Sequence, residues 1–248
     1  MSAELVQRRD IPVVVPLGIA AAWVVSAVVY VTGNATGLRH DKLFHGGPSA
    51  PVGIGAFAVS WAVTVTAILL PSVIPAVRQC GRATAGWAAP ARGPLAFIGG
   101  YLAVWVVFGL ALLVFDHGVH TVADAFPWLG DRPWLVSAAT LALAGGYELT
   151  RVKGHWLARS REAEIRLRPT EQSLVVVFDL GRNVGAASLV TFWGLLLVMF
   201  AEGVFDLGVM AALAVTIGYE TRGRRGVAAT KLAGAALLAF AVITAVRR

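Results

Sequence analysis

Runs of about 20 mostly apolar residues recur along this 248-residue chain, and they constrain its fold more than any other feature. A helix rises about 1.5 Å per residue, so roughly 20 residues cross a bilayer core about 30 Å thick. Only 14% of the residues are charged, whereas a typical soluble domain carries charge on about a quarter of them. The sequence therefore excludes an ordinary soluble globule and predicts an integral membrane protein embedded in a lipid bilayer.

Seven apolar segments are predicted to form membrane helices, because each is long or nearly long enough to cross the hydrocarbon core. The sixth has only about 15 residues and is short for a full crossing, so the alternative is six spans. We expect an all-α, polytopic transmembrane helical bundle of six or seven spans that forms one integral membrane domain over residues 1–248. The segments are residues 11–31, 52–70, 95–115, 133–150, 184–203, 206–220 and 227–246.

The basic residues indicate the orientation of the chain, because cytoplasmic loops of membrane proteins collect Lys and Arg. With a cytoplasmic N-terminus, 16 of the 21 basic residues fall inside and 5 outside. The net charge of +7 does not indicate a nucleic-acid partner, because the basic residues lie in short loops between apolar runs. Arg far outnumbers Lys in a chain rich in Ala, Gly and Val, which favours a bacterial inner-membrane location.

The sequence lacks the residue patterns of the common enzyme classes. Cys80 is the only cysteine, so neither an intrachain disulfide nor an all-cysteine metal site can form. Five histidines are too few for the clusters of a membrane di-iron enzyme, and no nucleophile elbow, phosphate-binding glycine loop or zinc-protease motif occurs. We therefore expect a protein that is not an enzyme.

Four of the five histidines fall in the two loops that the charge pattern places outside: His40, His45, His117 and His120. His117 and His120 are three residues apart, and Asp124 follows four residues later. On a helical continuation of the third apolar segment, these three side chains would share one face. The alternative for each residue alone is a solvated side chain or a helix cap.

Carboxylates lie at the same predicted membrane surface as the histidines. Asp116 and Asp124 flank the histidine pair, while Glu202 and Asp206 stand where the fifth and sixth apolar segments meet. Imidazole and carboxylate groups together are ligands for Zn(II), Cu(II), Fe or Mn. Repulsion between Glu202 and Asp206 would be relieved by a cation, although both side chains can also simply face water.

Two further features are expected to be structural. Glu148 with Arg151, and Asp179 with Arg182, have the i, i+3 spacing of local ion pairs at helix ends. The interleaved charged and apolar residues after Thr150, including the run from Leu174 to Phe178, predict an interfacial amphipathic helix. Small residues permit close helix contact, which we expect within the bundle; they include Gly99, Gly100, Gly145, Gly146, Gly181, Gly185 and Gly234.

Several local patterns occur in a characteristic order: RRD before the first segment, SWAVTVTAILLPS, GGYLAVWVVFGLAL, LALAGGYELTRVK and TFWGLLLVMFAEGVFDLGVM. Together they resemble the bacterial family of predicted metal-binding integral membrane proteins, over about residues 8 to 222. The resemblance implies a shared helical scaffold. It is carried by Trp61, Pro71, Ser72, Gly100, Tyr101, Trp105, Gly145, Tyr147, Leu149, Thr150, Lys153, Trp193 and Glu220.

The soft metal ligands that the resemblance would imply are replaced in this chain. The family's methionines in the second segment fall at Thr64, Ile68 and Leu69, and its loop cysteines fall at Trp156 and Ser160. Its Gly-Cys-Cys run falls at Val190, Thr191 and Phe192. Thioethers and thiolates bind Cu(I) because they are polarizable, and apolar or hydroxyl side chains cannot substitute for them.

Three functions remain open at this point. The first is the handling of a divalent transition metal at the outer face by His40, His45, His117 and His120, completed by Asp116, Asp124, Glu202 or Asp206. The second is a structural or assembly subunit that packs against other membrane proteins and has lost metal binding. The third is a small-solute transporter, which would use discontinuous helices and polar residues near the membrane midplane.

Overall fold

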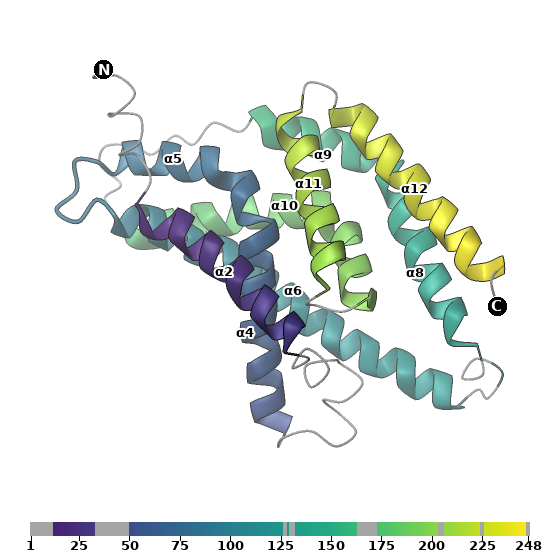
Figure 1. Cartoon of the computed structure of the whole chain (residues 1–248). Helices are drawn as coiled ribbons and strands as arrows, with labels where there is room; N and C mark the ends of the chain where they lie inside the picture. The colour runs from purple at the N-terminus through teal and green to yellow at the C-terminus, as the bar shows by residue number, and fades with distance from the viewer. Residues whose placement is uncertain are drawn as a thin grey trace.

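Within the residues that the computed structural model describes, which are 12–32, 50–125, 128, 132–162, 173–202, 206–223 and 226–246, the chain is helical and contains no strand. The helices cross one another at various angles and enclose one main hydrophobic core (Figure 1). Their bounds are α2 (Val14–Val31), α4 (Ala50–Ile68), η2 (Leu70–Val73), α5 (Ile74–Ala83), α6 (Arg92–Ala125), α8 (Pro133–Glu148), α9 (Arg151–Glu162), α10 (Leu174–Glu202), α11 (Leu207–Arg222) and α12 (Gly226–Val246).

Four of these helices are long and apolar enough to cross a membrane, namely α2, α6, α10 and α12. The bent pair formed by α4 and α5 raises that number to five if it is one broken span. The predicted number of six or seven also includes α8 and α11, which have 16 residues each. The all-helical class predicted from the sequence agrees with the described residues.

Two helices extend further than the apolar pattern predicted. Helix α6 continues past residue 115 to Ala125, through the segment that carries His117. Helix α10 begins at Leu174, so the run from Leu174 to Phe178 belongs to a long helix and not to a separate interfacial one. Asp179 and Arg182 do not interrupt α10, because both side chains are exposed and form the predicted ion pair at 3.2 Å.

A sharp bend separates α4 from α5. The two helix segments meet at 51°, because Pro71 lacks a backbone N–H and cannot continue the hydrogen-bond ladder. Carbonyls exposed by the break have protein donors: Ser72 Oγ donates to Leu69 O at 2.6 Å, and the Arg222 guanidinium at the end of α11 donates to Pro71 O. The bend thus turns α5 away from the axis of α4, as Figure 1 shows.

Helices α6 and α10 cross in close backbone contact and run parallel. A β-carbon on Gly100 would overlap the carbonyl oxygen of Phe178, and one on Gly181 would overlap that of Phe97. Further along both helices, the Tyr101 hydroxyl and Ser188 Oγ are hydrogen-bonded at 2.9 Å. The predicted use of glycines for contacts inside the bundle is therefore confirmed at this crossing.

Helices α8 and α12 form a second close pair, which lies side by side in Figure 1 and runs antiparallel. A β-carbon on Gly145 would lie 2.9 Å from the carbonyl oxygen of Gly234. On the other helix, a β-carbon on Gly234 would lie 2.8 Å from Leu149 Cδ2. Small residues on both partners therefore set the separation of this pair as well.

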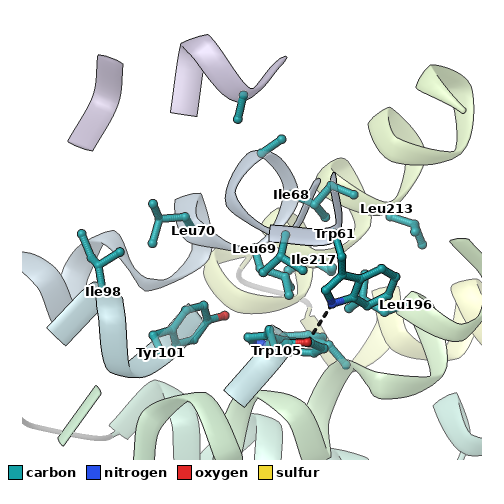
Figure 2. Close-up of a cluster of buried hydrophobic side chains, with 14 of the residues drawn as sticks. Trp61, Ile68, Leu69, Leu70, Ile98, Tyr101, Trp105, Leu196, Leu213 and Ile217 are labelled. Carbon is teal, nitrogen blue, oxygen red and sulfur yellow. Dashed lines mark hydrogen bonds between the residues drawn. The ribbon is translucent and has the colours of Figure 1, made fainter. Parts of the chain in front are cut away.

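The main core lies between α4, α6, α10 and α11 (Figure 2). Trp61 Nε1 donates to the carbonyl oxygen of Trp105 at 2.7 Å. The indole of Trp61 reaches that carbonyl because Gly109, one turn further along α6, has no side chain in its path. Both indoles are fully buried, so this contact fixes α4 against α6.

The α6–α10 crossing yields a direct test. Gly100→Ala should lower the free energy of unfolding by roughly 1–3 kcal/mol, as overpacking does in well-packed cores, because the opposing atom is backbone and cannot move aside. Gly99→Ala is the matched control, since its β-carbon meets only the Phe178 ring at 3.7 Å. Denaturant unfolding in detergent measures both, and equal losses would contradict the crossing.

Candidate functional site

Three charged side chains meet in the interior, where the ends of α8 and α11 approach the start of α9. Lys153 Nζ lies 2.9 Å from Glu220 Oε2 and also forms an ion pair with Glu148. The side chains of all three residues are 0% exposed. We call Glu148, Lys153 and Glu220 the buried triad.

The triad is surrounded by apolar and aromatic groups. Lys153 Nζ lies 5.5 Å from the centroid of the buried Phe192 ring, which is a cation–π distance. Next to it, the Tyr147 hydroxyl donates to the carbonyl oxygen of Val190 on α10. Together these contacts tie α8, α9, α10 and α11 to one another at a single level of the bundle.

Charge in such a place must be paired, because removing an ion from water costs several kcal/mol. Here one ammonium is paired with two carboxylates, and Glu148 Oε1 is buried and has no hydrogen-bond donor among the residues that the structure describes. Removing Lys153 would leave two carboxylates without a counter-ion in an apolar interior. The triad is therefore a strong constraint on how α8, α9 and α11 pack.

The sequence interpretation of these residues was partly wrong. Glu148 was expected to pair with Arg151, but it pairs with Lys153, while Arg151 is exposed. Lys153 was assigned to the basic loop residues, but it is completely buried. The burial of Glu220 could have been predicted from the sequence. Glu220 continues the apolar stripe of Met210, Leu213 and Ile217 at helical spacing, and these residues are all buried on α11.

The structure does not gather the predicted metal ligands into one described site. His40 and His45 lie outside the described residues, and so do the side chains of His120, Asp124 and Glu202. The backbone positions 117, 120 and 124 all belong to α6, so the helical continuation on which they share a face is confirmed. His117 is exposed there, and the described residues contain no group of three His, Cys, Asp or Glu side chains able to hold a metal ion.

Two of the carboxylates predicted as metal ligands, Asp206 and Asp116, have described side chains. Asp206 caps the N-terminus of α11, where its Oδ1 accepts from the backbone N–H of Val209 at 2.9 Å. The sequence had left cation binding or a side chain that faces water open for Asp206, and the structure shows a helix cap. Asp116 is half-buried on α6, directly before His117.

Five of the positions at which the resemblance would place soft metal ligands are buried here, whereas Trp156 on α9 and Val190 on α10 are only partly buried. Thr64 and Thr191 are fully buried, and their hydroxyls donate to the carbonyls of the preceding helical turn at 3.0 and 2.9 Å. Ile68, Leu69 and Phe192 pack in the hydrophobic core. The five buried positions therefore hold side chains that pack in the core or donate hydrogen bonds to their own helix.

The family model PpoB2, described as copper chaperone, matches residues 58–244, which is well over half of the chain. The chain belongs to this copper chaperone family. No curated protein and no solved structure matches it.

The buried triad can be tested by removing its single cation. Lys153→Met should destabilise the protein by about 3–5 kcal/mol, because it leaves uncompensated buried charge. Adding Glu148→Gln and Glu220→Gln to that variant should recover much of the loss. Arg182→Met is the control, since its exposed pair with Asp179 contributes at most about 1 kcal/mol. Comparable losses for Lys153→Met and Arg182→Met, measured by denaturant unfolding, would argue against the triad.

Proposed function

We propose that this chain is a non-catalytic integral membrane protein that handles a copper ion at the extracytoplasmic face of a bacterial inner membrane. The match to the copper chaperone family carries the metal-handling role. The ion is cargo, held during transfer and then released. In this proposal the whole chain, residues 1–248, is one membrane domain with a cytoplasmic N-terminus.

The helix directions support a seven-span arrangement. Parallel packing of α6 with α10 is expected of the third and fifth crossings, and antiparallel packing of α8 with α12 is expected of the fourth and seventh. The parallel packing of α6 with α10 requires α8 to cross the bundle between them. The antiparallel packing of α8 with α12 also requires α11 to cross, although α8 and α11 have only 16 residues each. Figure 1 agrees, since the ends of α6 and α10 and the starts of α8 and α11 lie toward the same side.

The proposed copper ligands are imidazole and carboxylate groups on that side. His117 and His120 stand on successive turns of α6, and the first outer loop supplies His40 and His45. The carboxylates proposed to complete the set come from Asp116, Asp124, Glu202 and Asp206. This ligand set fits Cu(II) among the divalent metals.

Metal analysis of the purified full chain tests the proposal. After exposure to Cu(II) and gel filtration in detergent, the wild type should retain about one copper ion per chain, and His117→Ala with His120→Ala should weaken binding by at least about tenfold. His155→Ala is the matched control, because His155 is an exposed histidine on α9. Substoichiometric copper in all three proteins would sink the proposal.

A second candidate function is supported by the packed ligand positions. Thr64, Ile68 and Phe192 fill the core where soft ligands would stand, as expected of a subunit that keeps the scaffold without the metal. This candidate predicts that the chain copurifies with other membrane proteins in mild detergent and binds no copper. A monodisperse chain that runs alone would count against it.

A further inference from the structure

Helix α9 presents a row of basic side chains on its outer face. Arg151, His155 and Arg159 recur every four residues, so they line one side of the helix, and all three are exposed. The opposite side carries Lys153 and Leu157, which are buried in the bundle. We call Arg151, His155 and Arg159 the basic stripe.

The buried triad fixes the orientation of α9 and leaves the charges of the stripe uncompensated. Arg151 was expected to pair with Glu148, but Lys153 takes that carboxylate in the interior. Among the residues that the structure describes, neither Arg151 nor Arg159 has an acidic ion-pair partner. The one acidic residue of α9 is its last, Glu162, whose side chain lies outside the described residues. The outer face of α9 is therefore positively charged.

The place of α9 in the chain is that of a helix at a membrane surface. Only two residues separate it from α8, which is one of the proposed spans. Figure 1 shows α9 at the same edge of the bundle as the end of α11 and the start of α12. Three outward-facing basic side chains make α9 too polar to lie in hydrocarbon. Trp156 is half-buried, and Arg159 Cζ lies 5.6 Å from the centroid of its ring, which is a pairing suited to the headgroup region.

Anionic headgroups match the chemistry of this face. A guanidinium group presents several N–H donors in a plane that fits the oxygens of a phosphate. A basic residue near a surface of anionic lipids contributes about fivefold in affinity. Because the buried face of α9 is held by Lys153 and Leu157, the helix that carries the arginines is already ordered before a lipid binds.

We infer that the basic stripe binds the headgroups of anionic phospholipids in the leaflet at which α9 lies. This inference rests on the membrane placement in the proposed function and does not involve copper. Arg151 and Arg159 donate hydrogen bonds to the phosphate oxygens. A bound lipid then ties α9 to the membrane surface and, through Lys153, also ties the ends of α8 and α11.

The test titrates the purified full chain in a neutral detergent with dioleoylphosphatidylglycerol or dioleoylphosphatidylcholine and counts bound lipids by native mass spectrometry. The wild type should bind the anionic lipid at least about tenfold more tightly than the zwitterionic one, and added salt should reduce this preference by screening. Arg151→Gln with Arg159→Gln should weaken binding of the anionic lipid at least about tenfold, because two arginines are lost.

Two controls separate the stripe from net charge and from misfolding. Arg132→Gln with Arg182→Gln removes the same number of positive charges elsewhere, because Arg132 is exposed at the start of α8 and Arg182 already pairs with Asp179. This variant should keep the preference for the anionic lipid. Arg151→Lys with Arg159→Lys keeps the charges of the stripe, so it should retain most of the affinity.

The outcomes that would overturn the inference are distinct from those that bear on copper. Equal binding of the two lipids by the wild type would overturn it and leave an acidic protein partner for this face. Equal losses in the two glutamine variants, or no recovery with lysine, would also overturn it. Retention of Cu(II) should be the same in the wild type and in every variant of the stripe, so a failed lipid test leaves the proposed copper function standing.

Discussion

The arrangement of this protein depends on the crossing of α6 and α10. In a bilayer, apolar side chains gain little by leaving lipid for protein, so helix association relies on close packing and on polar contacts. Gly100 and Gly181 let the two backbones touch, and the Tyr101–Ser188 hydrogen bond extends the contact. Because α6 and α10 run parallel, the segment between them has to return across the bundle. The returning segment contains α8, which packs beside α12, and α9, which contacts α11.

The two ends of the α10–α11 interface have different chemistry. At one end the buried triad joins Glu148, Lys153 and Glu220, and the ring of Phe192 on α10 covers the ammonium. At the other end lie two buried methionines and the Asp206 cap. Buried charge fixes the packing of one end, because separation of the ions would leave them unpaired.

The chain belongs to the copper chaperone family, and the positions at which the resemblance would place soft metal ligands carry hydroxyl and apolar side chains such as Thr64, Ile68 and Thr191. The buried hydroxyls of Thr64 and Thr191 each donate a hydrogen bond to a carbonyl of their own helix. The scaffold is thereby kept at full packing. In the proposed function, copper handling then depends on donors elsewhere, which the outer histidines supply.

The sequence by itself determined the elements, because the length of an apolar run and the spacing of glycines are local properties. It predicted the helical class, the glycine contacts, the Asp179–Arg182 pair and the helical continuation through His117. Only the tertiary structure decided which charges meet. Lys153 joins carboxylates from α8 and α11, and no local spacing distinguishes that contact from the expected pair of Glu148 with Arg151. Likewise, the Trp61 indole on α4 meets the carbonyl of Trp105 on α6 only in the folded bundle, because contacts between helices depend on how the helices pack and not on the spacing of residues within one helix.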